Sequence, residues 1–351
     1  DYPKDPEFKK RYGPRGVLHC KADGKGGQTI VDTGPLTKKR METIDEEVTE
    51  RALRFIDDAH QAGTPFFLWY NTTAMHFRTH CAEKHKGKSG QGDYNDVMVA
   101  HDENIGLMLN KLDKLGIADD TIVMYSTDNG VHYNTWPDAG ITPFRSEKNT
   151  NWEGGWRVPC FVRWPGQFKA GTVLNGIFSH QDWLATFLAA AGVPDVKEQL
   201  YKGMKVGKKT FKVHLDGYNI SDRLAGKGEN PRKEFFYWND DGSLVGLRYG
   251  NWKVVFQEQR SHGFDVWQDP FTELRLPKII NLRSDPFEIG DQVGIGYAKW
   301  RIDRTFLLVP AQILVGQFLA TFKEYPPSQK VGSFSLDQVL EKLQQSGSSG
   351  K

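Results

Sequence analysis

Cysteine is scarce in this sequence, which excludes a fold held together by many disulfides. The 351 residues contain only Cys20, Cys81 and Cys160. An odd and small number of cysteines predicts no disulfide framework, and it leaves the redox compartment open.

Long apolar runs and an excess of charge are also absent. No uninterrupted apolar run reaches about 18 residues, so the sequence predicts no membrane span and no membrane partner. The 46 basic and 44 acidic residues give a net charge of only +2, which produces no global field toward nucleic acid. Lysines gather in 197–212, where a solvated loop explains them at least as well as a polyanion site does.

What the sequence does contain is an alternation of helical and strand-like segments. The length, with 38% hydrophobic residues, supports a large domain beside a smaller one. Apolar residues at helical spacing alternate with short, continuous apolar runs, which are typical of strands buried on both faces. This alternation predicts an α/β fold with a parallel sheet between helices. The expected helices are 40–62, 94–115 and 179–192, and the expected strands are 65–71, 121–127 and 158–164, the last with Cys160 in the core.

The pattern changes after residue 230. Two strand-like runs meet at Gly250-Asn251, a good hairpin turn, and 278–286 reads as a further strand. An amphipathic helix is expected over 303–323, where Pro310 should start or kink it. Ser335 precedes a short final helix.

These patterns predict three parts of the chain. Residues 1–230 form the α/β domain, residues 231–345 form a smaller α+β subdomain with an antiparallel sheet, and residues 346–351 form a flexible polar tail.

The segment "TIVMYSTDNG" (121–130) ends a predicted strand on Asp128, Asn129 and Gly130. A plain turn is one interpretation, because Asp, Asn and Gly all suit tight backbone geometry. The other is a ligand site, because ligands of open α/β sheets bind beyond the carboxyl ends of strands. A carboxylate and an amide oxygen suit Ca²⁺ or Mg²⁺, although two side chains are too few to complete such a site.

Lys148 lies in a polar loop some twenty residues later. The stretch "EKNTNWEGGW" (147–156) places an aromatic residue and a glycine pair after this lysine, which indicates a tightly folded loop. A solvated lysine is the ordinary interpretation. A lysine held in such a loop could instead bind an anionic oxygen as a point charge.

Together these segments resemble the sulfatase family. Its members carry D-N-G and then G-K-x-x-x-x-E-G-G-x-R-x-P, and the chain has "DNG" followed by "EKNTNWEGGWRVPCFVRWPG". Glu147 replaces the usual glycine before the lysine. "NTTAMHFRTH" (71–80) is similar to the family segment with an active-site histidine, which makes His76 the first candidate and His80 the second. Weaker similarity in "FSHQDWLATFLAAAG" and "NLRSDPFE" extends the resemblance over most of 1–330.

Each histidine also has a structural interpretation. His76 could be a satisfied structural residue, but its place after a predicted strand favours a site. His180 and Asp182 begin a predicted helix, so capping or packing explains them better than chemistry does.

The resemblance implies an alkaline-phosphatase-like fold and the hydrolysis of sulfate esters. It implies that Asp128 and Asn129 ligate Ca²⁺, alternatively Mg²⁺. It implies that Lys148 contacts the sulfate, and that His76 binds sulfate or acts as an acid. The residues expected to orient the loop are Arg145, Glu153 and Arg157.

One family element is missing from the sequence. Sulfatases use a formylglycine nucleophile made within C/S-x-P-x-R, and neither the three cysteines nor any serine stands in that pattern. The chain also has no initiating Met. We therefore expect a fragment without the N-terminal part, inactive alone toward sulfate esters. Periplasmic or secreted localisation is an analogy with the family.

Two other functions remain open from the sequence. One is a phosphatase, phosphodiesterase or phosphonate hydrolase on the same fold, although such enzymes usually use several histidines and two metal ions. The other is a non-catalytic protein that binds sulfated ligands. The expected substrate is a small-molecule or a glycan sulfate ester, with selectivity expected from loops such as 197–215 and 258–278. The oligomeric state is not predicted.

Overall fold

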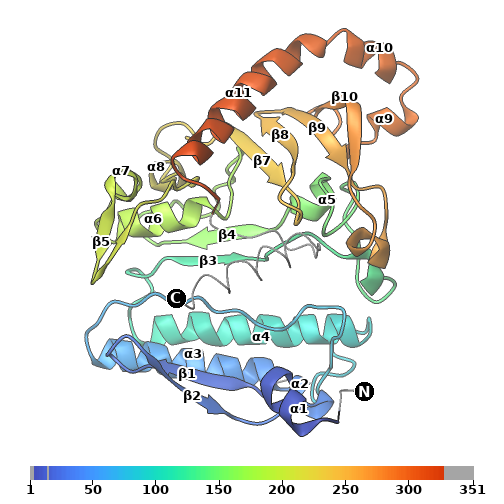
Figure 1. Cartoon of the computed structure of the whole chain (residues 1–351). Helices are drawn as coiled ribbons and strands as arrows, with labels where there is room; N and C mark the ends of the chain where they lie inside the picture. Colours follow the sequence, from blue (N-terminus) through green and yellow to red (C-terminus); the bar gives the residue numbers. More distant parts are fainter. Residues whose placement is uncertain (1–3, 14–15, 328–351) are drawn as a thin grey trace. The chain divides into compact units, whose positions relative to one another are not determined.

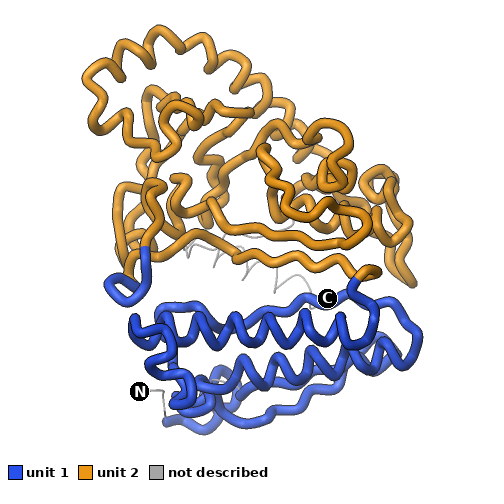
Figure 2. Tube along the Cα trace, turned by 180° about the vertical axis from the view of Figure 1, so that it is seen from behind, with its two compact units in different colours: residues 1–118, 135–140 blue, residues 119–134, 141–351 orange. Residues whose placement is uncertain are grey.

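The computed structural model describes residues 4–13 and 16–327. The chain divides into two compact units, one of residues 1–118 and 135–140 (unit 1) and one of residues 119–134 and 141–351 (unit 2) (Figure 2). The boundary expected at residue 230 falls inside unit 2, and the predicted division into domains stays a prediction. The expected tail and the expected helix after Ser335 lie outside the described residues.

Unit 1 is built on two long helices that pack against each other, α3 (Ile44–Gln61) and α4 (Asp93–Lys114) (Figure 1). Both were predicted from periodicity, and both are confirmed. Ile56 lies on the buried face of α3. Gly63 and Gly116 follow the two helices with φ of +60° and +69°, the left-handed geometry that commonly ends a helix.

The N-terminal part of unit 1 contains elements that the sequence analysis did not predict. A strand pair, β1 (Leu18–Ala22) with β2 (Gln28–Asp32), forms an antiparallel hairpin whose residues are all exposed. The first strand, "LHCKA", does alternate apolar and polar residues, a strand signal that the sequence analysis did not use. Two short helices are α1 (Pro6–Tyr12) and α2 (Lys38–Met41).

The prediction of a strand over 65–71 is wrong. This segment has no regular secondary structure, and Trp69 is 80% exposed. An extended segment becomes a strand only where a neighbour supplies ladder hydrogen bonds, and no described residue does so here.

Unit 2 begins with strands β3 (Val123–Ser126) and β4 (Cys160–Arg163), both predicted by position. They pair antiparallel, from Val123 opposite Arg163 to Ser126 opposite Cys160. Across residues 4–13 and 16–327 no parallel ladder forms, so the expected parallel pairing is not seen there. The expected burial of Cys160 is also wrong, because β4 has a single neighbour strand and its first two residues remain exposed.

Helices and small strands surround this pair within unit 2. Trp183 on α6 packs with Ile220 and Leu224, and Met124 of β3 and Val162 of β4 contact that cluster. The predicted helix at this position is confirmed as α6. The elements are α5 (Glu153–Trp156), α6 (Asp182–Ala190), α7 (Val196–Lys202), β5 (Met204–Val206), β6 (Lys209–Phe211) and α8 (Ser221–Leu224).

A four-stranded antiparallel sheet forms the C-terminal half of unit 2. An antiparallel sheet was predicted here, but the strand at 234–238 was not, and the strand expected over 278–286 runs over 272–281 instead. Its strands lie in the spatial order β10 (Thr272–Asn281), β9 (Trp252–Glu258), β8 (Leu244–Tyr249) and β7 (Glu234–Trp238). Gly250 and Asn251 make the predicted two-residue turn, with Gly250 at φ +56°.

One apolar helix, α11 (Leu308–Ala320), packs on this sheet through Ala311, which contacts Leu247 and Val254 (Figure 1). Pro310 lies in its first turn, where a missing N–H costs nothing, so the proline starts the helix as expected. By length and composition alone, the stretch Thr305–Lys323 could cross a membrane. Its apolar residues are interrupted by Gln312 and Gln317, so no unbroken apolar run marks it in the sequence. The expectation of no membrane partner is not confirmed. The short helices before it are α9 (Gly290–Val293) and α10 (Tyr297–Ile302).

Candidate functional site

The first predicted ligands lie where β3 ends. Asp128 is exposed, and its Oδ1 accepts a hydrogen bond from the Thr127 hydroxyl at 3.3 Å. Within the described part of the chain, Asp128 forms no ion pair with a basic side chain. Its carboxylate oxygens therefore remain available, as does the Asn129 amide beside it.

Gly130 brings the strand end against the loop that carries the glycine pair. Its N–H donates to the carbonyl of Gly155 at 3.0 Å. A Cβ at position 130 would lie 1.8 Å from the carbonyl oxygen of Gly154, so only glycine fits this close approach. The D-N-G and E-G-G segments, predicted to share a site, are thus in backbone contact.

Lys148 is held at the same place through its backbone. Its N–H donates to the carbonyl of Val131 at 2.8 Å. Ser146 and Asn149, on either side, have φ of +59° and +64°, which confirms the tight loop expected from the sequence. In the described ranges, Lys148 has no carboxylate within ion-pair distance, and its Nζ lies 5.9 Å from the ring centroid of Trp267.

Glu147 has a structural role that explains the departure from the family glycine. It is fully buried, and its two carboxylate oxygens accept the N–H groups of Tyr133 at 2.7 Å and Gly263 at 2.9 Å. The carboxylate therefore accepts backbone donors, and it forms no ion pair with the described Lys148 side chain. The sequence identified the unusual residue but not these partners.

Glu153 anchors the loop to the antiparallel sheet. Its carboxylate accepts from Arg157 at 2.8 Å, from the Tyr237 hydroxyl at 2.8 Å and from Lys253 at 3.1 Å. Burial alone would raise the pKa of Glu153, but Lys253, Arg248 and Arg157 more than offset it and lower the pKa to about 2.

Arg145 holds the other end of this loop. Its guanidinium lies over the Trp152 ring, 3.5 Å from the centroid, and donates to Asp291 at 2.8 Å. These contacts and those of Glu153 fix the loop around Lys148.

The helix start at 179–182 also reaches the strand end. His180 Nε2 lies 2.8 Å from the Thr127 carbonyl, next to Asp128. The sequence analysis had interpreted His180 as capping or packing. Asp182 is structural, as expected: it is fully buried, its carboxylate accepts the N–H of Ser179 at 2.9 Å, and it forms an ion pair with Arg232 at 2.6 Å.

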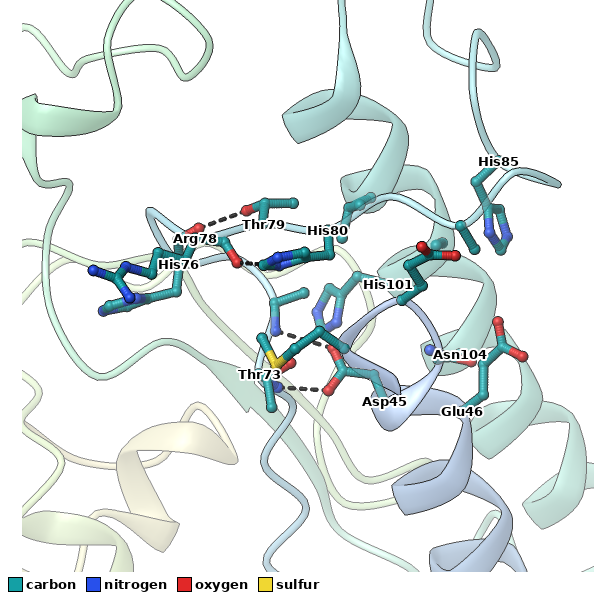
Figure 3. Close-up of a pocket in the computed structure, with 16 residues that line it drawn as sticks. Asp45, Glu46, Thr73, His76, Arg78, Thr79, His80, His85, His101 and Asn104 are labelled. Carbon is teal, nitrogen blue, oxygen red and sulfur yellow. Dashed lines mark hydrogen bonds between the residues drawn. The ribbon is translucent and has the colours of Figure 1, made fainter. Parts of the chain in front are cut away.

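His76 belongs to unit 1, whereas the residues above belong to unit 2. It lines a cavity of about 290 Å³ between α3, α4 and the loop 73–85. His76 and Arg78 project on the same side of that loop (Figure 3). The loop is tied together by two bonds, from Thr79 Oγ1 to the His76 carbonyl at 2.5 Å and between His80 Nδ1 and the Arg78 carbonyl at 2.8 Å.

Deeper in the same cavity, Asp45 fixes the start of the loop. Its carboxylate accepts the N–H groups of Thr73 at 2.6 Å and Ala74 at 2.9 Å (Figure 3). Burial lowers the pKa of His101, which lines the cavity from α4, and this favours its neutral form. His76, Arg78 and His80 line the same cavity from the loop 73–85.

Unit 1 contains a group of three potential metal ligands, one of which has a structural role. Cys81, Asp93 and Asp96 approach within 4.8 Å of one another. Asp96, however, accepts the N–H groups of Gly87 at 2.6 Å and Ser89 at 2.7 Å, as a loop cap does.

The donor chemistry at 128–129 fits a hard divalent cation only in part. Asp128 offers a carboxylate that pairs with no described basic residue, and Asn129 offers an amide oxygen. These are the ligand types that Ca²⁺ and Mg²⁺ prefer. Two side chains supply fewer oxygens than the roughly six to eight that Ca²⁺ takes. These residues would therefore hold part of a coordination shell.

Comparison with known proteins identifies the family. The model of the Sulfatase family matches residues 3–193. Human arylsulfatase A is 28% identical over 68% of this chain and 46% of its own length. N-acetylgalactosamine-6-sulfatase of Mus musculus is 32% identical over 72% of this chain and 49% of its own length. The chain thus spans about half the length of these curated relatives.

Solved structures agree with this assignment at the level of the fold. The PsFucS1 sulfatase from Pseudoalteromonas sp. superposes with a TM-score of 0.73 at 24% identity, covering 93% of this chain and 61% of that one. The structure of Ps i-CgsB in complex with k-i-k-neocarrahexaose gives 0.58 at 20% identity, covering 85% of this chain and 59% of that one. The predicted fold class, α/β of the alkaline-phosphatase-like sulfatase type, is confirmed. On the match of its family model and of its relatives, the chain belongs to the sulfatase family.

Proposed function

We propose that the chain contributes the cation-binding and anion-binding half of a sulfuric ester hydrolase of the arylsulfatase type. The observation that carries this proposal is the pair of backbone hydrogen bonds from Gly130 to Gly155 and from Lys148 to Val131. They hold in one folded loop system a carboxylate segment and a lysine that form no ion pair with any described residue.

Each residue has a proposed role. Asp128 and Asn129 ligate a divalent cation, Ca²⁺ or alternatively Mg²⁺, and when bound this ion stabilises negative charge on sulfate oxygens. Lys148 binds a sulfate oxygen through its ammonium group. His76 binds sulfate or donates a proton to the leaving oxygen as the S–O bond breaks.

Local charge supports the role of Lys148. Its neighbour Glu147 accepts two backbone N–H groups, and the buried Glu153 is paired with Arg157 and Lys253. The carboxylates near the loop are therefore occupied, which leaves the Lys148 ammonium for an external anion. A preorganised cation stabilises developing charge without reorganisation during the reaction.

The nucleophile is the part that the chain does not contain. We propose that hydrolysis requires a formylglycine from a C/S-x-P-x-R segment outside these 351 residues. The substrate is proposed to be a small-molecule or glycan sulfate ester. Relatives described as N-acetylgalactosamine-6-sulfatase and a solved complex with neocarrahexaose support the glycan side of this range.

The purified 351-residue chain should release no 4-nitrophenol from 4-nitrophenyl sulfate above a Lys148→Ala control, because no residue can serve as the family nucleophile. 4-Nitrophenyl phosphate, assayed in parallel, addresses the phosphatase alternative. Sulfate turnover that depends on Lys148 would contradict the external nucleophile. Turnover of the phosphate alone would contradict the sulfatase assignment.

A further inference from the structure

The loop between β9 and β10, residues 259–271, presents two exposed aromatic side chains beside Lys148. Phe264 is 58% exposed and Trp267 is 49% exposed. Single exposed aromatics are ordinary on protein surfaces. These two differ because both contact His132, and Trp267 also lies under the Lys148 ammonium.

The loop is fastened to the lysine loop rather than free. The Asn149 amide donates to the Val266 carbonyl at 2.8 Å, and the Trp152 indole donates to the Gln259 carbonyl at 3.2 Å. Glu147, directly before Lys148, accepts the N–H of Gly263 at 2.9 Å. Val266 is buried between the exposed aromatics. The position of Trp267 is therefore set by the same residues that set Lys148.

The orientation of the indole is fixed as well. Trp267 Nε1 donates to Nε2 of His132 at 2.9 Å, and the two ring planes lie within 9° of each other, with centroids 6.2 Å apart. An N–H···N bond lies in the planes of both rings. The indole and the imidazole therefore form one broad flat surface whose ring-edge polar groups are satisfied.

The Lys148 ammonium lies over this surface, at about the longest distance at which a cation–π contact forms. Its Nζ lies 5.9 Å from the indole centroid, close to the roughly 6 Å beyond which such contacts fade. A flat ring resting on the indole would bring an attached anionic group toward the ammonium. An exposed aromatic next to an unpaired cation suits a ligand that is a ring with an anion on its edge.

We propose that Trp267, with Phe264 beside it, is the surface on which the sugar ring of a sulfated saccharide stacks while Lys148 holds its sulfate group. This inference rests on the proposed function and names its substrate class. Exposed polar groups at the rim favour a sugar over a plain aryl group: Gln268 and Asp265 contact each other at 3.3 Å and can exchange hydrogen bonds with hydroxyl groups. Binding sites commonly combine an apolar face with a few such orienting groups.

Calorimetric titrations of the full 351-residue chain, in buffer with Ca²⁺, test this assignment. The ligands are N-acetylgalactosamine 6-sulfate, 4-nitrophenyl sulfate and inorganic sulfate. The variants are Trp267→Ala, Trp267→Phe, Lys148→Ala and the control Trp69→Ala, which removes an indole that is 80% exposed in unit 1. The indole N–H resonance of Trp267, identified by its loss in Trp267→Phe, reports where the ligand binds.

Trp267→Ala should weaken binding of the sugar sulfate roughly tenfold, as expected for the loss of an aromatic face. Trp267→Phe should retain most of the affinity, Trp69→Ala should match wild type, and inorganic sulfate should bind Trp267→Ala unchanged. The Trp267 resonance should shift with the sugar sulfate.

Three results would overturn the assignment in distinguishable ways. If Trp267→Ala binds the sugar sulfate as wild type does, while sulfate binding is intact and depends on Lys148, the stacking surface alone is contradicted. A loss confined to 4-nitrophenyl sulfate assigns the surface to aryl rings and removes the sugar. If no sulfate binding depends on Lys148, both the stacking surface and the proposed function are contradicted.

Discussion

Replacing Gly130 by alanine is expected to destabilise the protein by more than about 3 kcal/mol and to abolish sulfate binding. The added Cβ would lie 1.8 Å from the Gly154 carbonyl oxygen and 2.8 Å from its carbon. Both are backbone atoms, so relief requires the two loops to separate. Separation would break the bond from Gly130 to Gly155 that joins the strand end to the lysine loop. Urea denaturation followed by tryptophan fluorescence gives the free energy of unfolding.

Gly140 provides a matched control for this substitution. A Cβ at this position meets no atom within 4 Å, and its φ lies outside the left-handed region. Gly140→Ala should change the free energy of unfolding by less than about 0.5 kcal/mol. If the two variants unfold at the same urea concentration and both bind sulfate, the close approach of the loops is not a requirement of the fold.

The second large effect is expected from Glu153→Gln, which should cost about 3 kcal/mol or more. The substitution removes the charge that faces Lys253, a fully buried ammonium 3.1 Å away, and leaves Glu288 as its acidic partner at 2.7 Å. It also removes the carboxylate that binds Arg157 at 2.8 Å. Breaking a buried ion pair is costly because the remaining charge is left with incomplete compensation.

The pH dependence of stability gives this prediction a second measurement. The pKa of Glu153 is about 2 in the folded chain, against an ordinary value of 4.5. A lowered folded-state pKa contributes stability that is present above about pH 4.5 and is lost as the pH falls toward 2. Burial raises the pKa of Glu288, so the contribution of Glu288 to stability increases as the pH falls, opposite to that of Glu153. The glutamine variant should therefore lose less stability than wild type between pH 4.5 and pH 2.

Glu324→Gln is the control for Glu153→Gln. Glu324 pairs with Lys212 at 2.8 Å, but both side chains are more than half exposed, and such surface pairs contribute little. This variant should unfold like wild type at neutral pH. Equal unfolding curves for the two glutamine variants would show that the Glu153 network does not hold the lysine loop to the sheet.

Local sequence signals predicted much of the fold. The helices of unit 1 followed from apolar spacing and terminal glycines, and the β8–β9 hairpin followed from Gly250-Asn251, because each signal acts within a few residues. The strand expected over 65–71 failed for a physical reason: strand formation depends on a partner, and a continuous apolar run does not supply one. The predicted burial of Cys160 was wrong for a similar reason, since the burial of a strand depends on which elements cover it.

The candidate site divides in the same way. Asp128, Asn129 and Lys148 were identified from the chemistry of their segments and from the family resemblance, and the structure joins those segments by backbone hydrogen bonds. The residues that hold these segments in place could not be predicted from local sequence, because contacts such as that between Glu147 and Gly263 join residues 116 positions apart. Trp267 gave no local signal, although it lies within 258–278, a loop expected to set selectivity.

Calcium-dependent sulfate binding by the 351-residue chain is the most direct measurement of the account, because it asks whether a cation at 128–129 and the ammonium of Lys148 act on one anion. Calorimetry should show sulfate binding that weakens when Ca²⁺ is removed with a chelator. Asp128→Ala should lose this calcium dependence, and Lys148→Ala should bind sulfate at least about tenfold more weakly, as expected for a lost charged hydrogen bond. Sulfate affinity that is the same with and without Ca²⁺, and the same in both variants as in wild type, would contradict it.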